Sequence, residues 1–186
     1  MWCSRLFEDR EGSLWIGTEG AGLNRFQDVK FASFGKPEGL AYDLLVPITE
    51  DRQGNVWMGS YGGGLHRYHG GQFRALTTRD GLSSNLVASL LEDHTGALWV
   101  GTDGGGVNLF RNGAFRVYRT RDGLPSDRVI ALAEDREGSL WIGTFGGGVA
   151  RLREGRFTGL PSSDARWASR ATRCSLSPSM LRGVSG

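Results

Sequence analysis

The sequence is poor in the features that build metal sites, disulfide frameworks and membrane spans. Its 186 residues include two cysteines and three histidines, and Cys3 and Cys174 lie in no CxxC or metal-ligand spacing. No stretch approaches the roughly 20 apolar residues that a membrane helix needs. The first residues, MWCSRLFEDREG, lack the basic and apolar regions of a secretory signal. We expect no membrane span and no disulfide framework, and the sequence leaves the cellular location open.

A surplus of charge of one sign is also missing. The chain has 22 Lys and Arg against 20 Asp and Glu, a net charge of +2, and the basic residues form no block. Nucleic-acid-binding surfaces need clustered basic residues. The composition therefore predicts no nucleic-acid partner. With 39% hydrophobic residues the chain can still bury a core, and its 30 glycines indicate many tight turns.

What the sequence does have is a strict repeat of 42 residues. Its clearest marker is a tryptophan that recurs at Trp15, Trp57, Trp99 and Trp141. Six residues before each tryptophan stands an aspartate, preceded by glutamate; these aspartates are Asp9, Asp51, Asp93 and Asp135. A period of about 40–45 residues is typical of propeller blades, each made of four strands.

The third copy shows how one unit folds. Apolar runs at 86–92, 97–102, 107–110 and 115–118 are separated by DHTG, DGGG and RNG. Asp at the start of a turn accepts backbone N–H bonds, and glycine adopts the positive φ that tight reversals need. Each copy is therefore predicted to be a four-stranded antiparallel meander. The fold class is all-β, with four consecutive β-propeller blades that form a partial propeller or open arc.

The predicted domain is a propeller over residues 1–160, with blades at 3–34, 43–76, 85–118 and 127–160. Residues 161–186 are rich in Ser and Arg and show no strand alternation, so we expect a disordered tail. The strict repeat is lost abruptly there. A truncated or frameshifted reading frame would produce this, and a genuinely short protein is the alternative.

The repeated residues have structural interpretations. A tryptophan in every blade predicts contacts between blades, and an aspartate in every blade predicts a turn former and not an acid/base group. His66, His69 and His94 stand at three different repeat positions, so we expect surface or turn histidines and no metal site. No P-loop, GxSxG or HExxH motif occurs. We expect no catalytic residues and no cofactor.

Recognition residues are expected where a strict repeat varies, because loops on a rigid scaffold carry binding functions. The position after Gly-Thr or Gly-Ser holds four different residues: Glu19, Tyr61, Asp103 and Phe145. If the first strand of each blade is innermost, the segments that join blades lie on the same rim. These segments contribute Tyr42, Asp43, Ser84, Asn85, Asp127 and Arg128. Such a rim suits stacking on, and hydrogen bonding to, a small polar ligand or a carbohydrate.

The run LAEDREGSLWIGTFGGGVARL, with RDGLPSDRVI before it, resembles the two-component regulator propeller repeat. The resemblance covers residues 4 to about 160. It implies a ligand-sensing propeller, often for carbohydrate, from the extracytoplasmic sensor region of a bacterial hybrid histidine kinase. Family sensors have propellers of about seven blades followed by an Ig-like domain, a membrane span and a kinase. This chain has four repeats, and the first lacks the DGL segment that introduces the third and fourth.

Three functions follow from these observations. The leading hypothesis is a ligand-sensing or binding propeller of a two-component signal transduction protein. The first alternative is a protein–protein interaction scaffold that uses exposed blade edges, through self-association or pairing with further propeller blades. The second alternative is a propeller enzyme such as a lyase or quinoprotein, against which the lack of aligned histidines counts.

Overall fold

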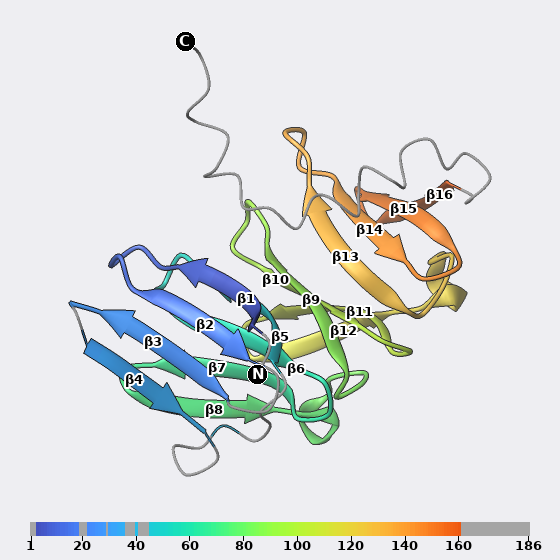
Figure 1. The fold of residues 1–186 in the computed structure, drawn as a ribbon. Coiled ribbons are helices and arrows are strands. Elements are labelled where there is room, and N and C mark those ends of the chain that lie inside the picture. The colour runs from blue at the N-terminus through green and yellow to red at the C-terminus, as the bar shows by residue number, and fades with distance from the viewer. Residues whose placement is uncertain (1–2, 19–21, 29, 36–39, 41–44, 161–186) are drawn as a thin grey trace.

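The computed structural model describes residues 3–18, 22–28, 30–35, 40 and 45–160. The chain forms four antiparallel sheets of four strands each, and within each sheet the strands lie in chain order (Figure 1). This confirms the predicted all-β fold class of four consecutive four-stranded blades. Within the described residues, no helix has the length and apolar character that crossing a bilayer requires. The predicted disordered tail, 161–186, lies outside the described residues.

The strand limits repeat from sheet to sheet. The first sheet contains β1 (Cys3–Glu8), β2 (Leu14–Thr18), β3 (Leu23–Gln27) and β4 (Lys30–Phe34). The second contains β5 (Leu45–Glu50), β6 (Val56–Ser60), β7 (Gly64–His69) and β8 (Gln72–Leu76). The third contains β9 (Val87–Glu92), β10 (Leu98–Thr102), β11 (Gly106–Arg111) and β12 (Ala114–Tyr118). The fourth contains β13 (Val129–Glu134), β14 (Leu140–Thr144), β15 (Gly148–Arg153) and β16 (Arg156–Leu160).

The geometry of the first hairpin, which is the same in all four sheets, explains why the aspartate is repeated. In the third sheet Asp93 Oδ1 accepts hydrogen bonds from the backbone N–H groups of Thr95 at 2.8 Å and Ala97 at 3.0 Å. Gly96 takes a φ of +81°. The other carboxylate oxygen accepts the indole N–H of Trp99 at 2.8 Å. The same aspartate–tryptophan bond occurs in all four sheets, and the predicted turn role of the aspartate is confirmed.

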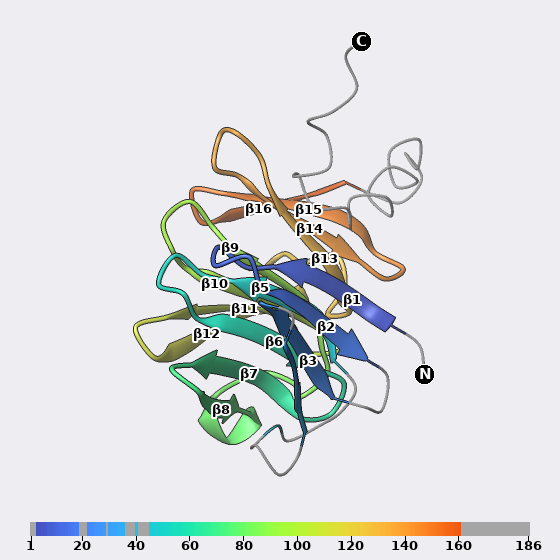
Figure 2. The same ribbon diagram turned by 60° about the vertical axis from the view of Figure 1, so that its left-hand side comes forward.

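The sheets stack on one another around their first strands. Strand β1 contacts β5, β5 contacts β9, and β9 contacts β13, so the first strand of each sheet is innermost (Figures 1 and 2). The tryptophan-bearing face of a sheet is here called the Trp face, and in the first three sheets it covers the opposite face of the next sheet. Between the first two sheets, for example, Trp15 packs with Ile48, Val56 and Met58. The predicted role of the tryptophan between blades is therefore confirmed.

Glutamates also join successive sheets. The carboxylate of Glu92 accepts the backbone N–H of Arg52 at 3.1 Å, and that of Glu134 accepts the N–H of His94 at 2.9 Å. Glu50 makes the same contact to Arg10. These are the glutamates that precede the repeated aspartates. Each turn is thus bonded to the next sheet as well as stabilised within its own.

The two outer faces of the stack differ from the inner ones. Leu6, Phe26 and Phe31 lie on the outer face of the first sheet and are exposed by 59%, 41% and 61%. Equivalent residues of the second sheet, such as Ile48, are buried against the first sheet. Among the described residues, β1 and β13 share no contact comparable to those between successive inner strands. The first sheet therefore presents an uncovered apolar face in this arrangement.

Candidate ligand-binding site

The rim is formed by the loops after the second strand of each sheet and by the segments that lead to the next sheet. In the third sheet, the N–H groups of Gly104 and Gly106 donate to the carbonyl of Asp127 at 3.1 and 2.8 Å. The loop of the second sheet makes the same pair of bonds to the carbonyl of Asn85. The variable loops of the second and third sheets are thus bonded to the segment that enters the next sheet.

Glycine is needed in these loops for space as well as conformation. Gly106 has a φ of +80°, and a Cβ there would lie 2.2 Å from the carbonyl oxygen of Tyr118. Gly64 has the same conformation, with 2.5 Å to the oxygen of Leu76. A side chain at either position would collide with backbone. The loops therefore hold the residues before these glycines in fixed positions.

Four of the predicted rim residues meet in one cluster that runs across three sheets. The Tyr61 hydroxyl donates to Asp103 Oδ2. The Arg128 guanidinium donates through Nε to Asp103 Oδ1 at 2.6 Å and through Nη2 to Oδ2 at 3.3 Å. Its Cζ lies 4.2 Å from the centre of the Phe145 ring. The structure therefore links three successive variable positions: Tyr61 bonds directly to Asp103, and Arg128 joins Asp103 to Phe145.

The cluster contains an ionised carboxylate and a guanidinium, and it is partly exposed to solvent. The hydrogen bonds from Arg128 and Tyr61 lower the pKa of Asp103, and the bond to the Asp103 carboxylate raises the pKa of Tyr61. The carboxyl group is thus ionised and the phenol neutral at pH 7. The Arg128 side chain is 50% exposed and Phe145 is 56% exposed. A ligand can therefore reach a guanidinium edge, a carboxylate and an aromatic ring together.

The other predicted rim residues have different positions. Ser84 lies beside the cluster, and its hydroxyl donates to the backbone oxygen of Asp103 at 3.4 Å. Asn85 and Asp127 accept backbone N–H bonds through their side chains, from Thr78 at 2.9 Å and Thr120 at 2.7 Å. They fix the short 3-10 turns Thr78–Asp80 and Thr120–Asp122. The remaining candidates, Glu19, Tyr42 and Asp43, lie outside the described residues.

The histidines differ in part from expectation. His94 stands in a turn, as predicted, and its Nδ1 contacts Glu134, which raises the pKa of His94. His66, in contrast, is fully buried between the first and second sheets. The surface expectation was wrong for His66 because strand alternation turns it inward, beside Met58. In the described part of the chain, no three His, Cys, Asp or Glu residues gather as a metal-binding group.

The sequence interpretation missed a second polar region, at the opposite ends of the strands. A cavity of about 410 Å³ between the second and third sheets is lined by Arg67, Arg74 and Arg111, among others. Arg67 and Arg74 are cross-strand partners on β7 and β8. Comparing the four repeats position by position would have found this pair.

A family model described as the two component regulator propeller matches the chain at residues 2–20, 81–104 and 115–146. The matched ranges include Trp15, Trp99 and Trp141 together with the turns before them. No curated protein sequence matches the chain at a significant level.

Solved structures extend the likeness to the whole stack. The extracellular domain of a hybrid two-component system from B. thetaiotaomicron has 26% identity and a TM-score of 0.79, over 88% of this chain and 23% of that chain. A second such domain from the same organism has 22% identity and a TM-score of 0.72, over 85% and 25%. The present chain therefore spans about a quarter of the length of these domains.

Propeller enzymes share the fold at lower identity. Virginiamycin B lyase from Staphylococcus aureus has 14% identity and a TM-score of 0.68, over 84% of this chain and 54% of that chain. At this identity the likeness shows the fold alone. The match to the two component regulator propeller model is more specific, because it includes the tryptophans and the turns before them, and it shows that the repeats at 2–20, 81–104 and 115–146 are similar to those of that family.

Proposed function

We propose that the cluster of Tyr61, Asp103, Arg128 and Phe145 binds a small polar ligand, most simply a carbohydrate, as the ligand-sensing rim of a two-component signalling protein. The observation that carries this proposal is that three variable loop positions meet in one cluster, in which Arg128 contacts Asp103 and Phe145 and Tyr61 bonds to Asp103. A rim that served only as scaffold would not need different residues at these positions.

The chemistry of the cluster suits a sugar. An exposed aromatic ring can stack on the apolar face of a pyranose, while planar charged groups hydrogen bond to its hydroxyls. Arg128 uses Nε and Nη2 for Asp103, and within the described residues its Nη1 makes no hydrogen bond. Nη1 is therefore placed to donate to a ligand. The Asp103 carboxylate and the Tyr61 oxygen can accept from it.

Substitutions at the rim are expected to weaken this binding. Arg128→Ala removes the charged donor and Phe145→Ala removes the stacking surface, so each should raise the dissociation constant at least tenfold, about 1.4 kcal/mol. Calorimetric titration against a panel of neutral mono- and oligosaccharides measures the change. Arg153→Ala, an exposed arginine on the fourth sheet far from the rim loops, should bind like the native chain. The proposal fails if no saccharide binds, or if the rim variants bind as tightly as the Arg153 control.

We also propose that the rim binds its ligand without transforming it. Asp103 is held as a carboxylate by Arg128 and Tyr61, and a lowered pKa makes it a poor general acid near neutral pH. Mass spectrometry of the ligand after prolonged incubation checks this. A new product would favour the lyase-like alternative.

A second function, association through a blade face, is favoured by the apolar outer face of the first sheet. Leu6, Phe26 and Phe31 occupy positions that the second sheet buries against its neighbour. The complementary surface is the Trp face of another blade of this repeat, in a second copy or in further propeller blades. The face is therefore proposed to pair with such a blade.

We expect the purified 186-residue chain to form dimers or larger species at micromolar concentration. The double substitution Leu6→Ser and Phe31→Ser should return it to the 20.2 kDa monomer by making the outer face polar. Size-exclusion chromatography with light scattering gives the mass. Phe145→Ser, which removes an equally exposed hydrophobic residue from the rim, should leave the mass unchanged. A native chain that is monomeric throughout this range would refute the pairing.

A further inference from the structure

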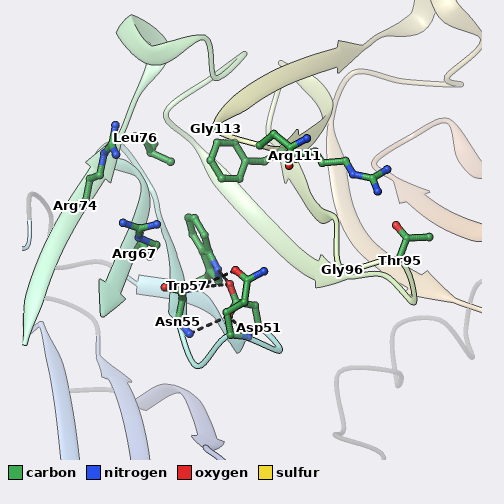
Figure 3. Close-up of a pocket in the computed structure, with 13 residues that line it drawn as sticks. Asp51, Asn55, Trp57, Arg67, Arg74, Leu76, Thr95, Gly96, Arg111 and Gly113 are labelled. Atoms are coloured by element: carbon green, nitrogen blue, oxygen red, sulfur yellow. Dashed lines mark hydrogen bonds between the residues drawn. The ribbon is translucent and has the colours of Figure 1, made fainter. Parts of the chain in front are cut away.

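The cavity between the second and third sheets lies at the ends of the strands opposite the rim. It has a volume of about 410 Å³, within the range of small-molecule sites. The turn at Asp51 and the β11–β12 turn at Gly113 both contribute to its lining (Figure 3). Trp57 and Phe110 form its apolar wall, and their rings meet edge to face at 5.5 Å. Residues of both sheets thus form the walls of the cavity.

Two arginines stand directly opposite each other on adjacent strands of this cavity. Arg67 on β7 pairs with Arg74 on β8. Figure 3 shows both at the same side of the cavity, with Arg111 on the other side. Like charges at directly opposed positions destabilise an antiparallel pair. The second sheet therefore places two like charges at paired positions, with Arg67 half-buried and Arg74 exposed.

The other three sheets avoid this repulsion. The equivalent pairs are Arg25 with Ala32, Leu109 with Arg116, and Arg151 with Thr158. Each has a single arginine. The double arginine is therefore a feature of the second sheet and not a requirement of the repeat.

The acidic partner found in other sheets is also replaced. Arg151 bonds to Glu137 at 3.1 Å, and Arg25 contacts Glu11 at 3.4 Å. The equivalent position in the second sheet holds the neutral Gln53, which lines the cavity. The Arg67 guanidinium lies over the Trp57 ring, with Cζ 5.9 Å from the ring centre. The second sheet thus carries two arginines at paired positions, whereas the first and fourth sheets pair one arginine with a carboxylate.

The carboxylates near the cavity are already engaged. Asp51 accepts the N–H groups of Gln53 and Asn55 at 2.9 Å through Oδ1, and the Asn55 amide and the Trp57 indole at 2.7 Å through Oδ2. Hydrogen bonds from the N–H and the hydroxyl of Thr77 lower the pKa of Asp80, and the charge of Arg74 adds a smaller effect in the same direction. In the described part of the chain, no ion pair within 4.0 Å involves Arg67, Arg74 or Arg111.

We propose that this cavity is a binding site for a doubly charged oxyanion, sulfate or phosphate, either free or as the ester group of a small molecule. The guanidinium groups of Arg67 and Arg74, on one side of the cavity, are planar donors of the kind that binds such anions most strongly. An anion between Arg67 and Arg74 would convert their repulsion into two attractive contacts. The aromatic wall of Trp57 and Phe110 leaves room for an organic group attached to the anion. The site is separate from the rim, so neither proposal depends on the other.

Substitutions copied from the other repeats test the site without breaking the fold. Arg67→Leu introduces the residue found at Leu109, and Arg74→Thr introduces the residue found at Thr158. Arg116→Thr is the matched control, because Arg116 is the equivalent of Arg74 in the third sheet and faces Leu109. All three remove one positive charge from the same type of strand position.

The experiment follows thermal unfolding during titration with sodium sulfate or sodium phosphate, against sodium chloride at equal ionic strength. Sulfate stabilises folded proteins in general by exclusion from their surface. Binding is therefore measured as the saturable part of the rise in melting temperature, beyond the rise in sodium chloride. The native chain and Arg116→Thr should show this excess, and both cavity variants should need at least tenfold more anion to reach it. An equal response in all four proteins would overturn the proposal.

A second titration distinguishes the source of the anion. Phenyl phosphate should bind more tightly than inorganic phosphate if the cavity accepts an ester whose organic group contacts the aromatic wall. Equal affinity would assign the site to the free ion. In anion-free buffer of low ionic strength, Arg74→Thr should be at least as stable as the native chain, because the repulsive pair is gone. A marked loss of stability in Arg74→Thr under these conditions would show that Arg74 stabilises the native chain, which would contradict a repulsive contact between Arg67 and Arg74.

Discussion

Replacing Trp57 by alanine is expected to lower the free energy of unfolding by about 3–5 kcal/mol, the range for a fully buried aromatic side chain. Trp57 is 4% exposed, contacts Phe110 of the next sheet, and donates its indole N–H to Asp51 at 2.7 Å. The substitution opens a cavity at the junction of two sheets and leaves one oxygen of a buried carboxylate with a single donor. Chemical denaturation followed by tryptophan fluorescence and circular dichroism measures the loss.

Two comparisons separate the contributions to this loss. Trp57→Phe keeps most of the buried ring and removes the hydrogen bond to the carboxylate, so it should lose about 1.5–3 kcal/mol. Trp141→Ala should lose less than Trp57→Ala, because Trp141 is only partly buried on the outer Trp face of the fourth sheet. Equal losses for Trp57→Ala and Trp141→Ala would show that contacts between sheets are not what buries this residue.

Much of this architecture could be predicted because the repeat supplies four independent copies of each signal. Aspartate, glycine and tryptophan at fixed spacing predict a hairpin and a buried aromatic residue in every copy. The bond between the Trp57 indole and Asp51 could not be predicted. Strand alternation gives the face on which a side chain lies, but not the direction in which its ring turns.

The sequence predicted which residues lie on the rim, but not which of them contact one another. The repeat placed Tyr61, Asp103 and Phe145 at equivalent loop positions, and the inner position of the first strands placed Arg128 on the same side. Which of these residues bond depends on the twist between successive sheets, which has no sequence signal. For the same reason, Asn85 and Asp127 were grouped with the recognition residues although their side chains fix the 3-10 turns.

The rim and the cavity illustrate one property of this repeat. Positions that keep the same residue in every blade form turns and contacts between sheets, as Asp51 and Trp57 do. Positions that vary are free to acquire charge, as at Asp103 on the rim and Arg74 in the cavity. A departure from the repeat is therefore the best guide to chemistry that the scaffold does not need.

His66 is such a departure, and it should make the stability of the chain depend on pH. The equivalent position is Asn24 in the first copy and Asn108 in the third. The imidazole is fully buried, and its Nε2 lies 3.2 Å from the Ser60 hydroxyl. Its Nδ1 has no hydrogen-bond partner among the described residues. Burial lowers the pKa of His66 from 6.5 to about 4, because the charged form loses its hydration.

The sign of the effect follows from linkage. Above pH 6.5 the imidazole is neutral in both states, and the folded protein has its full stability. As the pH falls from 6.5 towards 4, the unfolded chain gains a proton that the folded chain does not bind, so the free energy of unfolding decreases. At 1.36 kcal/mol per pKa unit, the loss approaches about 3 kcal/mol near pH 4.

The substitution His66→Asn, which restores the residue of two other repeats, should remove this part of the pH dependence. Several aspartates, Asp93 and Asp103 among them, also have lowered pKa values. Their protonation lowers the free energy of unfolding at still lower pH, and it does so in both proteins. The difference between native and variant unfolding curves from pH 7 to pH 4 therefore isolates His66. His94→Asn is the control, since Glu134 raises the pKa of His94 and its loss acts in the opposite direction. Parallel curves for the native chain and His66→Asn would show that His66 gains its proton in the folded protein at nearly its ordinary pKa. The interface between the first two sheets would then admit water more easily than its close contacts indicate.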